Sequence, residues 1–249
     1  MKIIRFSYVG EEHEGTFDNG VVVGRNGSVY SVRDIVWLPP SKPRNIVGLA
    51  LNYGKHAEEL GLKASEKPVL FLKPVSSLTG HMSNIIKPSG TKYVHYEGEL
   101  AVVMGKKCRN VSRREAMEYV LGYTIANDVT ARDFITNMFR PPVQAKGYDT
   151  FCPVGPWIVT KDEIEDVHDL EIVTSVNGEV KQKDRTSSMI HRVEEIVSHI
   201  SSFMTLSGGD IILTGTPEGI SPVEHGDVIE ITIEGIGTLR NNIIDEVRG

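Results

Sequence analysis

The stretch YVHYEGELAVVM, residues 93–104, has the two-residue alternation that is typical of a β-strand. Because successive side chains of a strand point to opposite faces, one face would carry Glu97, Glu99, Ala101 and Val103. The other face would carry Tyr96, Gly98, Leu100, Val102 and Met104. Two carboxylates about 7 Å apart on an apolar face repel each other unless a cation lies between them. The pattern therefore predicts a buried strand with a cation beside it, either a lysine or a metal ion.

The N-terminal part of the chain, residues 1–32, consists of short β-prone stretches separated by the turn sequences DNG and RNGS. This pattern predicts a small antiparallel unit. The proline-rich stretch WLPPSKPRN follows it and predicts a stiff linker. We therefore expect a small N-terminal β domain with its linker over residues 1–45 and a larger domain over residues 46–249.

The larger domain has more strand signals than helix signals. KPVLFLKP, YTIAND and GDIIL predict strands, and VIEITIEGIGTLRNNI predicts a hairpin. The capping-box spacing of Ser112 and Glu115 predicts a helix through REAMEYVL that ends at Gly122. Apolar residues at helical spacing over 193–204 predict a second helix, which the glycines at 208–209 would stop. No regular βαβ alternation is visible, so the predicted fold class is α+β, predominantly β.

Composition narrows the class of protein. The 249 residues are 40% hydrophobic and 24% charged, which is typical of a globular protein with a large core. The net charge of -6 comes without a basic cluster, so we expect no nucleic-acid partner and no membrane partner. Cys108 and Cys152 form no CxxC pair, which disfavours a disulfide framework or a thiolate zinc site. The N-terminus lacks a signal-peptide pattern and no apolar run could cross a bilayer, so we expect a cytoplasmic location.

A third acidic residue, Asp128, follows the predicted strand YTIAND in the loop NDVTARD. With Glu97 and Glu99 it would form an all-oxygen site, and no histidine or cysteine has comparable ligand spacing. Such a site suits Mg²⁺, Mn²⁺ or Ca²⁺ rather than zinc. The alternative is that the two glutamates lie on a half-exposed strand edge and that Asp128 caps a turn.

A histidine and a glutamate lie three residues apart in LNYGKHAEELG, at His56 and Glu59. If KHAEEL is helical, the two side chains share a face. A carboxylate beside an imidazole raises the basicity of the ring, as a general base requires. The alternative is a surface ion pair on a short helix.

Two lysines stand near the ends of predicted strands, Lys73 in LFLKP and Lys146 in QAKGYDT. Each could neutralise an acidic site or bind a substrate carboxylate. The alternative is a surface lysine whose stem covers apolar groups. The loop TGTPEG offers backbone N–H groups and the Thr216 hydroxyl to an anion, although it lacks the lysine of a P-loop.

Together these stretches resemble the fumarylacetoacetate hydrolase family. The resemblance rests on motifs that follow one another in family order from about residue 46 to the C-terminus. They are LNYGKHAEELG, PVLFLKPVSSLTG, YEGELAVVMGKKCRNVS, GYTIANDVTARD, KGYDTFCPVGPWI, VNGEVKQ and FMTLSGGDIILTGTPEGI. A variable small N-terminal domain is usual in this family, so residues 1–45 fit the pattern.

The resemblance implies a C-terminal-domain-like mixed β roll or sandwich, usually dimeric, with a Mg²⁺ or Mn²⁺ ion. The metal ligands would be Glu97, Glu99 and Asp128, and the catalytic residues would be His56, Glu59 and Lys146. The substrate-binding residues would be Lys73, Tyr53, Thr216 and Gly215. The cation between the glutamates would then be a metal ion. The resemblance also implies that His56 and Glu59 belong to a lid over the site, and Ala50 stands where many members carry glycine at the hinge before LNY.

The resemblance also implies the substrate class. Family members act on 2-oxo acids and 2-hydroxy-dienoic acids, and a metal ion held by three carboxylates can stabilise the enolate of such a substrate. YVHYEGELAVVMGK, FMTLSGGD and TGTPEGISPVEHGD are most similar to the branch of 2-hydroxyhepta-2,4-diene-1,7-dioate isomerase and 5-oxopent-3-ene-1,2,5-tricarboxylate decarboxylase. We therefore expect an isomerase or decarboxylase of dicarboxylic dienoates in aromatic catabolism.

Two alternatives to this activity stay open. The His56 and Glu59 pair also suits an acylpyruvate carbon–carbon hydrolase, which must activate water, and oxaloacetate decarboxylation would need the same metal. A β-rich binding protein without catalytic activity is the other class, but a pure binder needs no base.

Overall fold

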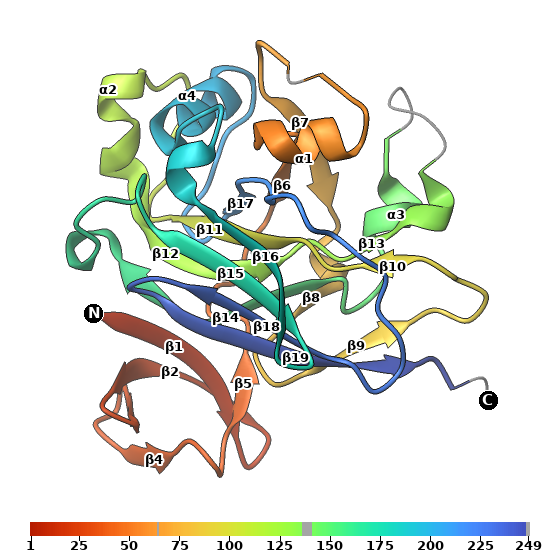
Figure 1. The fold of residues 1–249 in the computed structure, drawn as a ribbon. Coiled ribbons are helices and arrows are strands. Elements are labelled where there is room, and N and C mark those ends of the chain that lie inside the picture. Colours follow the sequence, from red (N-terminus) through yellow and green to blue (C-terminus); the bar gives the residue numbers. More distant parts are fainter. Residues whose placement is uncertain (64, 136–140, 248–249) are drawn as a thin grey trace.

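The computed structural model describes residues 1–63, 65–135 and 141–247, and Figure 1 shows its arrangement. The strands of the N-terminal part are β1 (Lys2–Tyr8), β2 (Glu11–Asp18), β3 (Val21–Gly24), β4 (Val29–Ser31) and β5 (Val36–Leu38). The next are β6 (Ile46–Ala50), β7 (Val69–Lys73), β8 (Leu78–Thr79), β9 (Asn84–Lys87), β10 (Val94–His95), β11 (Gly98–Met104) and β12 (Val120–Asn127). The last are β13 (Thr130–Ala131), β14 (Cys152–Thr160), β15 (Glu171–Val176), β16 (Glu179–Arg185), β17 (Ile211–Leu213), β18 (Val228–Ile233) and β19 (Gly237–Asp245). The α-helices are α1 (Gly54–Glu59), α2 (Arg113–Ala116), α3 (Val143–Lys146) and α4 (Val193–Phe203).

Within the described residues the strands form three sheets. A 12-stranded sheet contains the path β4-β3-β2-β1-β14-β12-β11-β17-β6-β7, and a 5-stranded sheet has the order β16-β15-β18-β19-β9. The strands β10 and β13 form a small 2-stranded sheet. Pairing is mostly antiparallel, but three pairs are parallel: β17 with β6, β9 with β19, and β8 with β14. The predicted α+β class, predominantly β, is confirmed.

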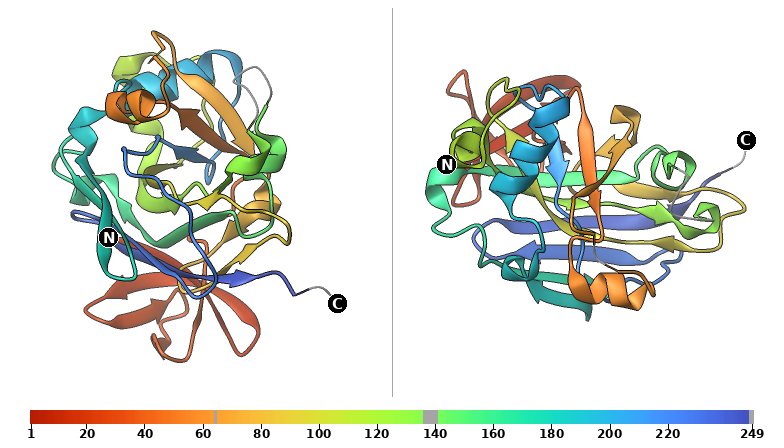
Figure 2. Two further views of the ribbon diagram at one scale, coloured as in Figure 1. Left: turned by 45° about the vertical axis from the view of Figure 1, so that its right-hand side comes forward. Right: turned by 90° about the horizontal axis from the view of Figure 1, so that it is seen from above.

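The two larger sheets pack face to face, as Figure 2 shows from two further directions. β15, β18 and β19 lie against β11, β12 and β14. The layer between them is apolar and includes Leu100, Val102, Ile125, Ile172 and Ile231. Burial of apolar side chains is the main favourable contribution to folding, so this layer holds β11 and β12 in place.

The opposite face of β11 packs on a smaller cluster, which contains Ile46, Ala101, Ala126, Cys152, Val154, Ile211 and Leu213. Every residue of β11 is buried, so the expectation of a strand without a solvent face is confirmed. Because Glu99 shares its face with Ala101, its carboxylate lies inside the protein rather than on a sheet edge.

The N-terminal strands β1–β5 form an antiparallel unit with its own small core of Ile4, Phe6, Val22 and Ile35. This unit lies away from helices α1, α2 and α4 in Figure 1. It is joined to the rest of the chain through the pairing of β1 with β14. The linker is shorter than predicted, because Val36–Leu38 forms β5 on the edge of β1. The division into domains at residue 45 stays a prediction.

Two helix ends differ from the prediction. The capping box of Ser112 and Glu115 is present, but helix α2 ends at Ala116, a 3₁₀ turn follows, and β12 begins at Val120. Gly122 therefore lies in a strand, where a Cβ would come within 2.1 Å of the Val159 carbonyl oxygen of β14. Close approach of two strands, not a helix stop, explains this glycine. Helix α4 ends at Phe203, before the glycines at 208–209.

Candidate metal centre and active site

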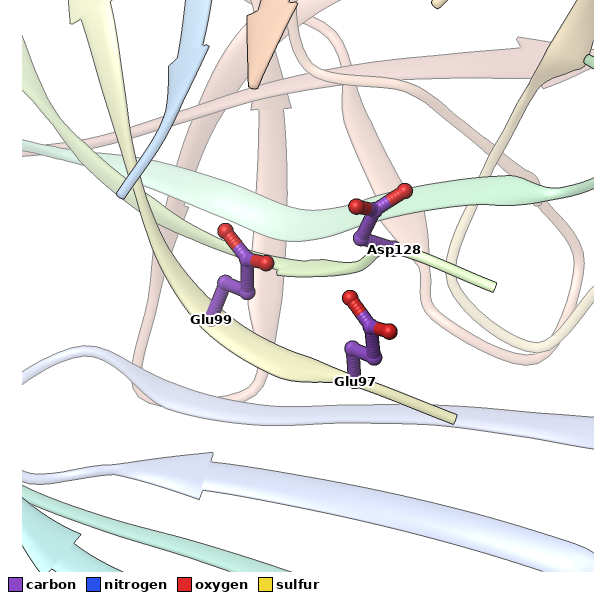
Figure 3. Close-up of side chains that lie close together, drawn as sticks. All are labelled: Glu97, Glu99 and Asp128. Carbon is purple, nitrogen blue, oxygen red and sulfur yellow. The ribbon is translucent and has the colours of Figure 1, made fainter. Parts of the chain in front are cut away.

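Two neighbouring strands carry three carboxylates to one place. Glu97 directly precedes β11, Glu99 lies within it, and Asp128 directly follows β12. Gly98 pairs with Asn127 in this antiparallel ladder, so the end of β12 lies beside the E-x-E segment. One oxygen from each carboxylate lies within 4.8 Å of the others, and all three residues are buried. Figure 3 shows the three side chains on the same side of these strands.

Three cations balance two of the three carboxylates. Lys73 Nζ donates to Asp128 Oδ1 at 2.6 Å, and both side chains are almost completely buried. Lys146 donates to Glu97 at 3.1 Å and also to Asp128. Arg132 forms an ion pair with Glu97. Lysine is therefore one of the cations that the sequence pattern predicted beside these carboxylates.

Glu99 is the exception among these carboxylates. Within the described residues it forms no ion pair, and its Oε2 accepts a hydrogen bond of 2.6 Å from the Gly215 N–H. Burial raises the pKa of Glu99 well above its ordinary value, and the negative charges of Asp128 and Glu97 raise it further. Glu97 behaves in the opposite way: although burial opposes ionisation, the charges of Lys146 and Arg132 lower its pKa to about 2.

This imbalance fits a divalent cation. An oxygen-only donor set suits Mg²⁺ or Mn²⁺, and a cation beside Glu99 would compensate the carboxylate that has no partner of opposite charge. The donor set is fully buried, so the alternative of a half-exposed strand edge does not describe these glutamates.

His56 and Glu59 lie on one face of helix α1. The Nδ1 atom of His56 is 3.0 Å from Glu59 Oε2, and Glu59 Oε1 accepts a hydrogen bond of 3.0 Å from the Gly219 N–H. Glu59 therefore connects the helix to the loop after β17. His56 is 5% exposed and lines a cavity, in contrast to the exposed pair of the alternative interpretation. Its catalytic role stays a prediction.

The cavity has a volume of about 770 Å³. Its polar lining consists of His56, Glu97, Arg132, Lys146 and Thr216. Its apolar lining consists of Leu49, Ala50, Leu51, Leu60, Leu62, Val69, Leu70, Phe71, Leu72, Ile135, Pro141, Pro142 and Val143. The polar residues would bind a charged group of a ligand, and the apolar residues would pack against the rest of the ligand.

The predicted substrate-binding residues differ in position. Thr216 lines the cavity, whereas Lys73, Tyr53 and Gly215 are not among the residues that line it. Lys73 is paired with Asp128, and Tyr53 is a buried residue at the start of α1. Burial raises the pKa of the Tyr53 hydroxyl far above its ordinary value, and the Glu99 charge adds to this rise. The substrate-binding roles of these residues stay predictions.

Three residues of the site were absent from the predicted set. Arg132 lines the cavity, and Gln182 contacts the loop after β17. Asn52, just before α1, donates to the Thr214 carbonyl of that loop and accepts from the His191 N–H. Each belongs to a stretch that the sequence analysis quoted, NDVTARD, VNGEVKQ or LNYGKHAEELG. The motifs thus included all three residues, but only the fold shows what their side chains contact.

The fold and the site define a β-rich protein with a buried carboxylate trio, of which Glu97 lines the cavity. Residues 45–244 match the family model for the fumarylacetoacetate hydrolase C-terminal domain, so the chain belongs to this family. The chain is thus an enzyme, in a family whose members include isomerase/decarboxylases and hydrolases. No described helix has the length and apolar character that a membrane span requires.

One relative is the 4-hydroxyphenylacetate degradation bifunctional isomerase/decarboxylase of Salmonella dublin, which is 43% identical over 208 residues. That match covers 84% of this chain and 48% of the relative, so the chain spans about half the length of that protein. A crystal structure of 5-carboxymethyl-2-hydroxymuconate delta-isomerase from Mycobacterium smegmatis has a TM-score of 0.90 at 41% identity and covers 100% of both chains. The maleylpyruvate hydrolase of a Sphingobium species, in complex with manganese and pyruvate, has a TM-score of 0.85 at 28% identity, over 99% of this chain and 100% of that one.

Proposed function

We propose that the protein is a divalent-metal-dependent isomerase or decarboxylase of 2-oxo or 2-hydroxy-dienoic dicarboxylic acids, in the breakdown of aromatic compounds. The observation that carries this proposal is the buried trio of Glu97, Glu99 and Asp128, in which Glu99 has no cationic partner among the described residues. The similarity to two proteins named as isomerases, at 43% and 41% identity, supports the same class of substrate.

The three carboxylates would hold Mg²⁺ or Mn²⁺. The maleylpyruvate hydrolase structure contains manganese, which supports a metal of this kind in the related site. Such an ion, when bound, supplies positive charge that stabilises an enolate.

The chain's own residues bind and orient the substrate. Lys146 and Arg132 are the cations that line the cavity among the described residues, and both contact Glu97. A substrate carboxylate would therefore be attracted to this end, while the carbon chain lies along the apolar wall. Arg132 lines the cavity, so its charge would attract a second carboxylate of the substrate.

Proton transfer falls to His56 in this arrangement. Although burial opposes its charge, Lys146 has a raised pKa because Asp128 and Glu97 stabilise the ammonium form. It therefore holds its proton and is a poor base. His56 lines the same cavity and has Glu59 on its Nδ1, so its other nitrogen is the atom that can move a proton.

Acylpyruvate-type hydrolysis is the second candidate. The His56 and Glu59 pair favours it, because hydrolysis needs a base that deprotonates water. The similarity to the maleylpyruvate hydrolase, at 28% identity, also supports hydrolysis. Decarboxylation of oxaloacetate is a further alternative, and it requires no such base. A homodimer and a cytoplasmic location are proposed with either activity.

One experiment separates these activities. The purified protein is incubated in D₂O with Mg²⁺ and a panel of 2-hydroxy-dienoates, oxaloacetate and acylpyruvates, and products are identified by mass and NMR. Isomerisation gives a deuterated isomer, decarboxylation gives CO₂, and hydrolysis gives pyruvate and a second acid. We expect isomerisation or decarboxylation of the dicarboxylic substrates and no turnover by Glu99→Gln. Absence of all three reactions with every substrate would contradict the proposal.

A further inference from the structure

Gly98, the first residue of β11, separates Glu97 from Glu99, and its backbone groups point away from β12. The neighbouring Glu97 uses its own N–H and carbonyl on the β12 side, with Asn127 Oδ1 and the Asp128 N–H. Because these groups alternate sides along a strand, those of Gly98 face the other edge. There, β17 pairs only with Ala101–Val103 and ends before it reaches Gly98. Two buried backbone groups of Gly98 therefore need partners other than a strand.

Two side chains supply these partners. The Gly98 N–H donates to Gln182 Oε1 at 3.1 Å, and the Gly98 carbonyl accepts from the Thr216 hydroxyl at 2.9 Å. Gln182 Nε2 donates to Thr216 Oγ1 at 2.8 Å and so joins the two partners to each other. Gly98, Gln182 and Thr216 thus form a closed ring of three hydrogen bonds, in which both side chains are buried.

The direction of each bond in the ring is fixed. Because a backbone N–H can only donate, the Gln182 atom beside it must be the oxygen, and the amide nitrogen then donates to Thr216. The Thr216 hydroxyl consequently gives its single proton to the Gly98 carbonyl. In this arrangement the hydroxyl holds the strand and has no proton left for a substrate anion.

The ring also determines where Glu99 is held. Gly215 adjoins Thr216, and its N–H donates to Glu99 Oε2 at 2.6 Å. Gly215 has a φ of 94°, and a Cβ there would lie 2.8 Å from the Cβ of Asn52, so only glycine suits this turn. The position of Thr216 therefore controls the donor that orients Glu99.

Thr174 is a neighbour of the ring without being part of it. A Cβ on Gly98 would lie 2.2 Å from its Oγ1, so Thr174 packs directly against the same peptide. It is fully buried, and its hydroxyl has no hydrogen-bond partner within the described chain. Thr174 thus matches Thr216 in residue type, burial and proximity to Gly98, but not in hydrogen bonding.

We propose that Gln182 and Thr216 are positioning residues that hold Glu97 and Glu99 in the geometry that a divalent ion requires. This inference rests on the proposed function, since it presupposes that the carboxylate trio binds the ion. Mg²⁺ demands nearly ideal octahedral geometry, so a displaced ligand weakens binding. Loss of the groups that orient metal ligands typically lowers metal affinity by about 10- to 100-fold.

The test compares Thr216→Val with Thr174→Val, which make the same change on either side of Gly98. Free Mn²⁺ is measured by EPR during titration of the full-length protein, which gives the dissociation constant without any assay of activity. We expect Thr216→Val to weaken Mn²⁺ binding by about 10- to 100-fold and Thr174→Val to leave it unchanged. Thr216→Ser, which keeps the hydroxyl, should bind nearly as wild type does.

Gln182→Met gives an independent measurement, which also serves if Thr216→Val does not fold. Its Mn²⁺ affinity should fall by a similar factor. The double variant Gln182→Met/Thr216→Val should be no weaker than the weaker single variant, because the first substitution already opens the ring. Additive losses would contradict a shared ring.

The outcomes distinguish this inference from the proposed function. If wild type binds no Mn²⁺, or Glu99→Gln binds it equally well, the proposed metal site is wrong. If wild type binds through Glu99 but Thr216→Val and Gln182→Met bind as tightly, only the positioning role is overturned. A lower metal-free melting temperature with an unchanged dissociation constant would likewise mean that the ring supports the fold and not the metal ligands.

Discussion

The Nδ1 atom of His56 lies 3.0 Å from a carboxylate oxygen of Glu59, and both residues belong to the single short helix α1. The contact occupies one ring nitrogen, and we propose that the other exchanges a proton at the cavity, which His56 lines. A base held in this way is needed for water attack, but not for the departure of CO₂. The pair can therefore separate the two candidate functions.

We expect His56→Ala to lower hydrolysis of an acylpyruvate by about 10²- to 10⁴-fold, which is the usual contribution of a general base. Most of the decarboxylation of a 2-oxo dicarboxylate should survive, because that reaction needs no attacking water. Both rates are measured at saturating Mg²⁺. The matched control is His225→Ala, which changes an exposed histidine and should retain both activities. Hydrolysis at the wild-type rate in His56→Ala would show that the imidazole is not its base.

Glu99→Gln should stabilise the metal-free protein at neutral pH. In the folded chain the pKa of Glu99 is raised by burial and by the charges of Asp128 and Glu97, so the folded state retains a proton that the unfolded state has lost. Wild-type stability therefore falls as the pH rises from the unfolded pKa, about 4.3, towards the raised folded pKa. A glutamine at this position has no charge to bury, so Glu99→Gln does not lose stability in this way.

Melting temperatures in EDTA measure the effect of this substitution. The advantage of Glu99→Gln over wild type should be close to zero at pH 4 and should grow with increasing pH. Addition of Mn²⁺ should raise the melting temperature of wild type and leave that of Glu99→Gln unchanged, because ligand binding stabilises only the form that binds it. An advantage that is independent of pH would contradict the electrostatic cause.

Lys146→Met should destabilise the metal-free protein by about 1–3 kcal/mol, because it removes charged hydrogen bonds from buried Glu97 and Asp128, which keep only Arg132 and Lys73 as cationic partners among the described residues. Lys146 contacts Glu97 and Asp128, and all three are buried. Lys183→Met is the matched control, since Lys183 forms an exposed pair with Glu171 and its loss should cost less than about 1 kcal/mol. Urea unfolding gives both values. Similar losses in the two variants would show that Lys146 has no special role in the charge balance.

Arg132→Met should discriminate between substrates. The Arg132 side chain lines the cavity, so we expect its charge to bind the second carboxylate of a dicarboxylic substrate. Relative to wild type, kcat/KM should fall about tenfold more for a dicarboxylate than for an acylpyruvate with one carboxylate, as loss of one charged hydrogen bond implies. Loss of the Arg132 contact with Glu97 should affect both substrates equally, so the ratio of the two kcat/KM values is independent of it. Equal losses for both substrates would remove Arg132 from substrate recognition.

Local sequence determined those features whose cause lies within a few neighbouring residues. The alternation in YVHYEGELAVVM predicted β11, and Ser112 with Glu115 predicted the start of α2. The spacing of His56 and Glu59 predicted their contact, since residues three apart meet on a helix. The same stretches identified the family, because several specific motifs stand in one order.

The tertiary structure decided everything that depends on strand register and packing. Asp128 meets Glu97 only because Gly98 pairs with Asn127, and a shift of one residue would have turned the glutamates to the opposite face. Gly122 resembled a helix stop until the approach of β14 explained it. The ring of Gly98, Gln182 and Thr216 joins three segments that are far apart in the chain. No local pattern records such contacts, because burial of the whole core fixes which distant strand ends meet.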